Sequence, residues 1–158
     1  MRNSRWICGI VVFCALFAFG CSEPLPDGMP PLYPVTLTFQ QEGAPLEEAS
    51  IRLIPQFPCE WISGGSTDAG GRVQLKTHGK YHGVPAGKYK ICVNKFHSEG
   101  ELPTMDKPTK PMTHYNLVET QYTLPNQTPL EIEVIAGKNE FPPFDLGKVT
   151  QIELAAPQ

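Results

Sequence analysis

The sequence contains no apolar run long enough to span a membrane as a helix and no cluster of basic residues. Its longest apolar run, from Trp6 to Gly20, has 15 residues, whereas a membrane-spanning helix needs about 20. Nucleic-acid binding depends on several lysine or arginine side chains that neutralise neighbouring phosphates, and no such group is present. We therefore expect neither a permanent transmembrane anchor nor a nucleic-acid-binding protein.

Three motifs of common catalytic sites are also missing. The chain has no Gly-x-x-x-x-Gly-Lys-Ser/Thr loop, and the glycines between residues 66 and 93 are followed by alternating apolar and polar residues rather than a helix. It has no His-x-x-Glu zinc pair and no Gly-x-Ser-x-Gly nucleophile motif. We expect turn-forming glycines, no catalytic residues and no cofactor.

Four histidines keep a metal-binding alternative open. His78 and His82 stand four residues apart, a spacing that aligns ligands on one face of a helix, and His97 and His114 follow. The glycines and the proline around His78 and His82 disfavour a helix, so we expect exposed loop histidines and no metal site. A metal-binding periplasmic protein remains the second alternative.

The first 21 residues are typical of a bacterial lipoprotein. Arg2 and Arg5 precede the apolar run, as in a secretory signal peptide, and Ala18-Phe19-Gly20-Cys21 resembles a lipobox, although Ala18 and Phe19 are unusual there. We expect Cys21 to be lipidated and to hold the mature chain on a membrane; a freely secreted protein is the alternative. Without the signal, 11 basic residues face 16 acidic ones, a formal charge of −5.

Two cysteines, Cys59 and Cys92, remain after the signal peptide and Cys21 are set aside. An even number of cysteines in an exported protein makes them candidates for a disulfide, with two free thiols as the alternative. A bridge between them would close a loop of about 34 residues and contribute about 3 to 4 kcal/mol in the chain-entropy model.

Closely spaced prolines and glycines exclude long helices from the mature chain, and the segments between them alternate with a period of two. Alternation of this kind is typical of antiparallel strands with one face in water, and several such strands separated by turns predict an all-β sandwich. Glu131 and Glu133 lie on the outer face of the last of these strands, where a solvated surface is expected rather than a catalytic acid pair. The predicted inward residues are Val35, Leu37, Phe39, Ala49, Ile51, Leu53, Val73, Leu75, Tyr89, Ile91, Val93, Leu130, Ile132 and Val134.

Glycine and proline also mark the turns. Residues 42–45, 68–71 and 84–87 are predicted corners, and Asp68 is expected to bond its own backbone two residues on. Residues 96–128 show no sustained period and are expected to form a long irregular insertion, with a helical turn at residues 115–118.

The order of the turn motifs resembles that of the carboxypeptidase regulatory-like, or transthyretin-like, domain, which some small bacterial lipoproteins carry alone. The resemblance covers about residues 33–148. It implies a seven-stranded antiparallel Greek-key β-sandwich in a family whose small lipoprotein members mostly lack an assigned activity. The motifs that carry it are Gly43-Ala44-Pro45-Leu46-Glu47-Glu48-Ala49, Thr67-Asp68-Ala69-Gly70-Gly71, Gly83-Val84-Pro85-Ala86-Gly87-Lys88-Tyr89, residues 128–134 and residues 137–141.

The sequence departs from the family pattern in two places. Phe141-Pro142-Pro143-Phe144 interrupts the expected last strand, because proline cannot donate to a strand ladder. Cys59 and Cys92 are not part of the pattern, so their pairing does not follow from the resemblance.

Four aromatic residues are candidates for ligand binding: Trp61, Tyr81, Tyr115 and Tyr122. They lie in predicted loops or at strand ends, where a ring can stack on a sugar or a partner protein, or can instead cover a sheet edge. We expect a lipid-anchored, exported domain with a non-catalytic structural or interaction role at the cell envelope, and a carbohydrate-binding module is the first alternative. The expected divisions are a signal peptide (1–20), a proline-rich tether (21–32), the domain (33–150) and a tail (151–158).

Overall fold

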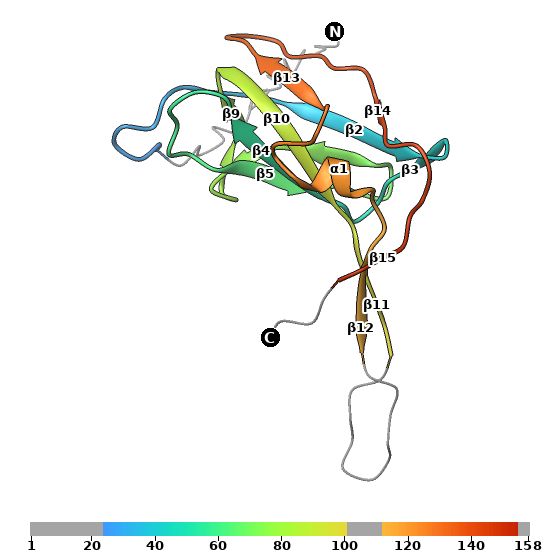
Figure 1. Ribbon diagram of the computed structural model, residues 1–158. Coiled ribbons are helices and arrows are strands. Elements are labelled where there is room, and N and C mark those ends of the chain that lie inside the picture. The colour runs from blue at the N-terminus through green and yellow to red at the C-terminus, as the bar shows by residue number, and fades with distance from the viewer. Residues whose placement is uncertain (1–23, 101–111, 155–158) are drawn as a thin grey trace, which may run out of the picture.

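The computed structural model describes residues 24–100 and 112–154 (Figure 1). These residues form a mostly β structure whose strands pair antiparallel with one exception, and they contain a single short helix, α1 (Thr120–Thr123). The predicted β class is therefore confirmed at this level. The predicted signal peptide and Cys21 lie outside the described residues.

The largest sheet has six strands, and β10 (Gly87–Asn94) is its longest. β10 pairs antiparallel with β4 (Ser50–Pro55) over six residues and with β13 (Glu131–Val134) over four. The order of the sheet is β13-β10-β4-β5-β7-β8, in which β5 is Ser63–Ser66, β7 is Lys76–Thr77 and β8 is Tyr81–His82.

A second sheet is built around β2 (Thr36–Gln41). β2 pairs antiparallel with β3 (Ala44–Pro45) and β6 (Arg72–Gln74), and parallel with β14 (Phe144–Asp145). The parallel pair corrects the expectation of an entirely antiparallel fold. Because Pro142 and Pro143 supply no donors, the chain forms only this short strand there, and the Phe144 ring stacks on Phe39 at 5.4 Å. The strands β1 (Leu32–Tyr33) and β9 (Val84–Pro85) form a separate antiparallel pair.

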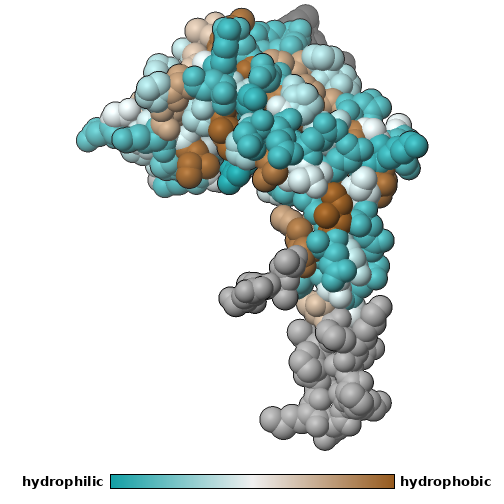
Figure 2. Space-filling model, viewed as in Figure 1, coloured by the Kyte–Doolittle hydropathy of each residue, from teal (hydrophilic) through white to brown (hydrophobic). Residues whose placement is uncertain are grey.

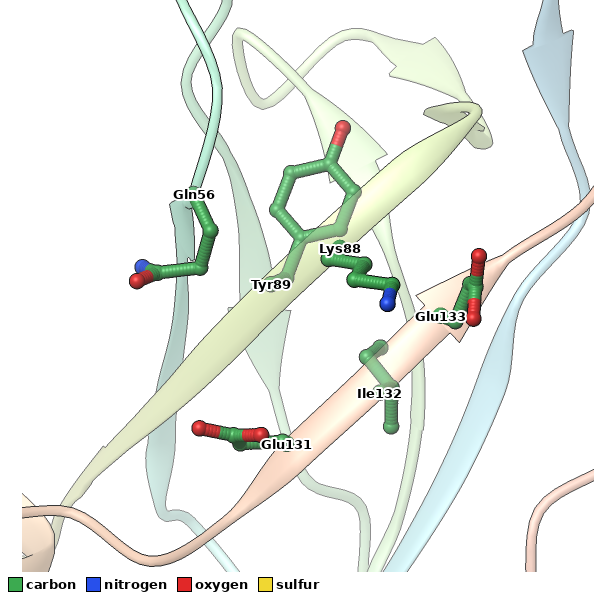
Figure 3. A pocket seen from close by; sticks show the side chains of 6 residues that line it. All are labelled: Gln56, Lys88, Tyr89, Glu131, Ile132 and Glu133. Atoms are coloured by element: carbon green, nitrogen blue, oxygen red, sulfur yellow. The ribbon is translucent and has the colours of Figure 1, made fainter.

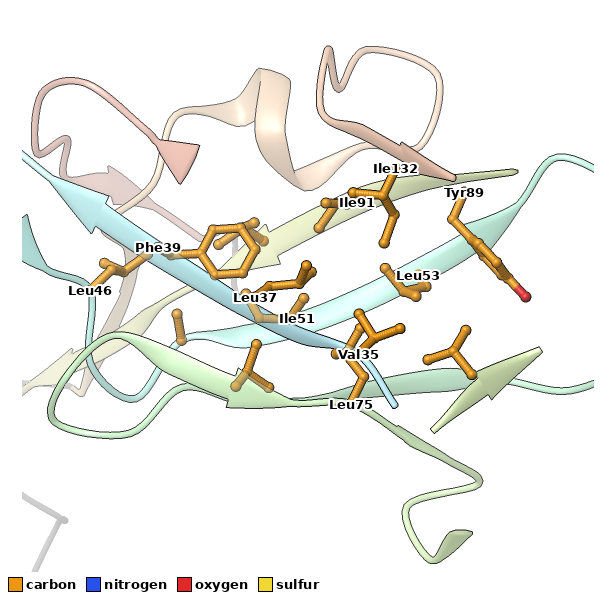
Figure 4. Packing of buried hydrophobic residues seen from close by; sticks show 14 of the residues in the cluster. Val35, Leu37, Phe39, Leu46, Ile51, Leu53, Leu75, Tyr89, Ile91 and Ile132 are labelled. Carbon is orange, nitrogen blue, oxygen red and sulfur yellow. The ribbon is translucent and has the colours of Figure 1, made fainter. Parts of the chain in front are cut away.

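Both sheets contribute to one hydrophobic core (Figure 4). The alternation seen in the sequence is confirmed, because all the predicted inward residues are buried except Leu130, which is partly exposed. Val84 joins them from β9, and Leu46, Val118 and Leu146 join them from turns and connections. Glu131 and Glu133 are exposed on the outer face of β13, as predicted.

The glycine-rich corner at residues 68–71 is a turn, as the sequence indicated. The Asp68 carboxylate accepts hydrogen bonds from the backbone NH groups of Gly70 and Arg72, each at 2.9 Å. Gly71 has φ +70°, and a Cβ there would collide with the Phe39 carbonyl oxygen. Glycine is therefore required at this position both for its conformation and for the close approach of β2.

The described residues of the predicted insertion, 96–100 and 112–128, are more regular than predicted. Phe96–Glu99 form β11, which pairs antiparallel with β12 (Thr113–Asn116), and β12 pairs in turn with β15 (Ile152–Glu153). The helical turn expected at residues 115–118 is wrong, because Asn116 is hydrogen-bonded into a strand and the helix begins at Thr120. β15 also places part of the predicted tail in a sheet.

β11, β12 and β15 form an arm that projects from the rest of the structure (Figure 1). Two buried amides fix its base. The Gln41 amide donates to the carbonyls of Leu117 and Lys148, each at 3.0 Å. The Asn116 Oδ1 accepts from the NH groups of Lys95 and Val118, each at 3.2 Å.

Candidate functional site

A groove of about 530 Å³ lies where three segments meet. One wall comes from the chain before β1, the second from the loop between β4 and β5, and the third from the turn between β9 and β10. The lining residues are mostly proline, aromatic or small, and Glu60 contributes the only carboxylate among them. They are Gly28, Pro30, Phe57, Pro58, Cys59, Glu60, Trp61, Pro85 and Ala86.

Phe57, which lines the groove, packs against Tyr89 and Gly87. The Phe57 ring packs edge-on against Tyr89, with 5.4 Å between ring centroids. A Cβ on Gly87 would collide with the Phe57 ring, so the absence of a side chain there makes room for it. The Tyr89 hydroxyl donates to the Pro85 carbonyl at 2.9 Å, and burial raises the pKa of this phenol far above its usual value. Tyr89 thus holds the β9–β10 turn in place as a neutral group.

Trp61 is the predicted aromatic residue that lies in the groove. It is half-buried, and its ring packs against the His78 imidazole with the centroids 5.0 Å apart. His78 is held there by the hairpin turn between β7 and β8, where it has φ +53°. Indole rings offer a large apolar surface for stacking, and the neighbouring Glu60 carboxylate is a hydrogen-bond acceptor. Trp61 and Glu60 together are suited to binding a ligand that has an apolar face and a hydrogen-bond donor or a cationic group.

The other three aromatic candidates lie elsewhere. Tyr81 is in β8, where the Lys80 ammonium lies 5.3 Å from its ring centroid. Tyr115 is in β12 on the arm, and Tyr122 is in α1. Burial raises the pKa of the Tyr122 phenol, and the carboxylates of Glu119 and Asp145 add to the shift. Tyr115 and Tyr122 therefore do not form a common site with Trp61.

Cys59 and Cys92 are free thiols in the structure, which is the alternative that the sequence left open, and their pairing stays a prediction. Cys92 is opposite Arg52 in the register of β10 and β4, whereas Cys59 lies in the loop beyond Pro55. Burial raises the pKa of the Cys92 thiol, although Arg52 and Lys90 act in the opposite direction.

A second, smaller hollow of about 260 Å³ lies on the outer surface of β10 and β13 (Figure 3). Lys88 is opposite Glu133 in the strand register, and Lys90 is opposite Glu131 with 3.9 Å between the charged atoms. Lysine therefore faces each carboxylate across the two strands. Glu131 and Glu133 therefore lie on a charged, solvated strand surface, as the sequence predicted. Each carboxylate faces a lysine, so the two do not form a carboxylate pair without other charged partners.

The four histidines fall into two separate places. His78 and His82 are exposed in and beside the β7–β8 hairpin. His97 and His114 are on the arm, where the His114 imidazole is 2.7 Å from the Ser98 hydroxyl. Within residues 24–100 and 112–154, no three histidine, cysteine or acidic side chains lie close enough together to hold a metal ion.

Sequence reasoning identified Trp61 but missed the residues around it. Phe57, Pro58 and Pro85 line the groove only because β4 ends and β10 begins at the same end of the sheet. The run Pro55-Gln56-Phe57-Pro58, an aromatic residue between prolines in a connection, is the sequence signal that could have identified this loop.

Comparison with family models, curated proteins and solved structures finds no match to this chain. Within the described ranges the chain also has no helix with the length and hydrophobicity that a bilayer crossing requires.

Proposed function

We propose that this protein is an exported, non-catalytic binding domain, anchored to a bacterial membrane through a lipidated Cys21, whose groove beside Trp61 binds an extended segment of a partner protein. The observation that carries this proposal is the composition of the groove. Its surface combines aromatic and proline side chains with a single carboxylate, Glu60. Such a surface offers stacking and apolar burial, which are the means by which extended, proline-containing peptides are recognised.

The position of the groove in the chain supports a role at the membrane surface. Gly28, in one wall, is seven residues after Cys21. An extended chain covers at most about 3.6 Å per residue, so the groove would be held within about 25 Å of the acylated residue. A partner bound there would belong to the membrane or to the layer directly above it.

For the fold, we propose the seven-stranded Greek-key sandwich that the motif order implies. In support, the turn at residues 42–45 joins the paired strands β2 and β3, the turn at residues 68–71 leads from β5 in one sheet to β6 in the other, and the sheets that contain β2 and β10 share one core. The family resemblance itself adds an expectation of an accessory role rather than a catalytic one.

A carbohydrate-binding module is the second candidate. Trp61 favours it, because a half-exposed indole beside a carboxylate is suited to stacking on a sugar ring and accepting a hydrogen bond from a hydroxyl. The two candidates use the same residues, so the ligand class must be decided by experiment.

The test is selection of a random peptide library on the mature protein, in parallel with a glycan array. We expect enriched peptides whose affinity falls at least tenfold in Trp61→Ala, about 1.4 kcal/mol of binding free energy. Ile62→Ala is the matched control, because Ile62 is 66% exposed, neighbours Trp61 and does not line the groove. Glycans that bind only when Trp61 is present would replace the peptide proposal with the second candidate. If peptides or glycans bind Trp61→Ala as tightly as Ile62→Ala, the proposal that the groove beside Trp61 is the binding site is wrong.

A further inference from the structure

The arm is an amphipathic sheet that lies apart from the core. The register places Phe96 and Ile152 on either side of Asn116, so these three side chains share one face. Ser98 and His114 continue that face, and the Leu154 NH donates to the His114 carbonyl, which brings Leu154 alongside. The opposite face carries His97, Glu99, Tyr115 and Glu153.

Around the buried Asn116, the uncharged face of the arm carries apolar side chains that are open to solvent. Phe96 is 61% exposed, Met112 39% and Leu154 38%. Figure 2 shows hydrophobic surface on the arm directly below the main body, next to hydrophilic surface. Exposed apolar side chains gathered on one projecting element are typical of an interaction surface.

One edge of the arm is also unpaired. Among the described strands, β11 has only β12 as a neighbour. The Leu117 NH donates to the Lys95 carbonyl at 2.8 Å, which fixes the direction of the backbone groups along β11. Because these directions alternate in an antiparallel pair, the NH and carbonyl groups of Phe96 and Ser98 point to the open edge. β11 itself contains neither a proline nor a lysine, the residues that commonly protect an edge strand from pairing with another strand.

We propose that two copies of this chain pair antiparallel through β11, with the two-fold axis at Ser98, and thereby join their arms into one continuous sheet. In this register His97 of one copy lies opposite Glu99 of the other, and the two-fold symmetry repeats this pair on the other side of the axis. Within one chain His97 Nε2 is already 3.5 Å from Glu99 Oε1, so imidazole donors and carboxylate acceptors would alternate along one face. This complementarity of donors and acceptors favours a second copy over an unrelated strand, because matched polar pairs directly across two strands are stabilising.

The same register suits the apolar face. Phe96 of each copy lies next to Gly100 of the other, the residue that follows β11, where no side chain competes for space. An aromatic side chain across from a glycine covers the exposed backbone of that glycine. The contact is isologous, so it closes as a dimer and does not continue into a fibre.

The first test is cysteine cross-linking of the full chain in the cells that export it. Ser98→Cys would place two thiols opposite each other at the two-fold axis, at a Cα separation of about 5.5 Å, within the range of a disulfide. We expect a cross-linked dimer at least fivefold more abundant than in the unsubstituted chain or in Glu153→Cys, which puts a thiol on the far strand of the arm. Equal cross-linking of Ser98→Cys and Glu153→Cys, or a Ser98→Cys adduct with a different protein, would overturn the proposal.

The second test exchanges the charges in the Ser98→Cys chain. His97→Glu would place two carboxylates opposite each other, and we expect the dimer fraction to fall at least threefold. Adding Glu99→Lys restores opposite charges in the same register, so the double variant should regain the dimer. If the dimer fraction is the same in the Ser98→Cys chain and in both charge variants, this register is ruled out.

The third test measures association without a cross-link. Ser98→Pro removes the NH that points to the open edge, while Ser98→Ala keeps it and equally loses the hydroxyl that contacts His114. We expect Ser98→Ala to remain dimeric by sedimentation and Ser98→Pro to be monomeric with an unchanged β-type circular dichroism spectrum. Monomers for both variants and for the unsubstituted protein would contradict the proposal.

Discussion

The side-chain amide of Gln41, at the end of β2, donates a hydrogen bond to the backbone carbonyl of Leu117, at the base of the arm, over 3.0 Å. The two residues are 76 positions apart in the sequence. The same amide reaches the Lys148 carbonyl, so one buried side chain joins three segments of the chain.

This relationship predicts that Gln41→Leu loosens the arm. The change removes both donors and leaves two carbonyls without these partners, which should lower the free energy of unfolding by about 2 kcal/mol. The measurement is chemical denaturation of the mature protein, together with hydrogen exchange of β12. Gln40→Leu is the control, because that side chain lies on the opposite face of β2. Equal stability of the two variants would show that Gln41 does not join the arm to the body.

Gly71→Ala should be much more destabilising than Gly43→Ala. Both glycines have positive φ, +70° and +77°, so both substitutions carry about 1 kcal/mol of backbone strain. Only at Gly71 would the new Cβ also clash with the Phe39 carbonyl oxygen, whereas a Cβ at Gly43 would point into open space. We expect a loss of about 2 to 4 kcal/mol at Gly71 by thermal or chemical denaturation. Similar losses at both positions would show that β2 does not approach this turn closely.

Stability should fall steeply above about pH 10, in part through Tyr89. Burial raises the pKa of this phenol in the folded protein, so the unfolded chain loses the proton first as the pH rises. Its contribution is complete below the unfolded pKa and decreases above it by at most about 1.4 kcal/mol per pH unit. Tyr89→Phe should be about 1 kcal/mol less stable at neutral pH, because the bond to Pro85 is lost, and should show a shallower alkaline decline. The control is Tyr33→Phe, and an unchanged alkaline slope in Tyr89→Phe would contradict this role.

The two free cysteines should differ in reactivity. Cys59 is partly exposed in the groove, whereas Cys92 is fully buried and burial raises the pKa of its thiol. We expect a thiol reagent at neutral pH to label Cys59 in the native protein and Cys92 only after unfolding, because the reactive species is the accessible thiolate. Mass spectrometry of the non-reduced protein identifies the labelled sites. A peptide that links Cys59 to Cys92 would restore the disulfide that the sequence suggested.

The strands were predictable from the sequence because their signal is local. Leu37, Ile51 and Ile91 alternate with polar neighbours, and a period of two places each of them in the core whatever the order of the sheet. Asp68 and Gly71 likewise carry their own turn chemistry. These features need no knowledge of distant parts of the chain.

The arm and the groove were not predictable because they depend on contacts between distant residues. Asn116 sits in a segment with little periodicity, and its strand exists because β11 and β15 pair with it on either side. Phe57 and Pro85 meet only through the register of β4 and β10.

Trp61 allows the most direct measurement of the central claim, that the groove binds a partner segment. The only other tryptophan, Trp6, lies in the predicted signal peptide, so indole fluorescence of the mature protein reports on Trp61 alone. Titration with a peptide enriched on the mature protein should change this fluorescence saturably, and Glu60→Gln should weaken the binding of a peptide that carries a basic residue. Fluorescence that stays constant while the peptide binds would place its site elsewhere and contradict the account.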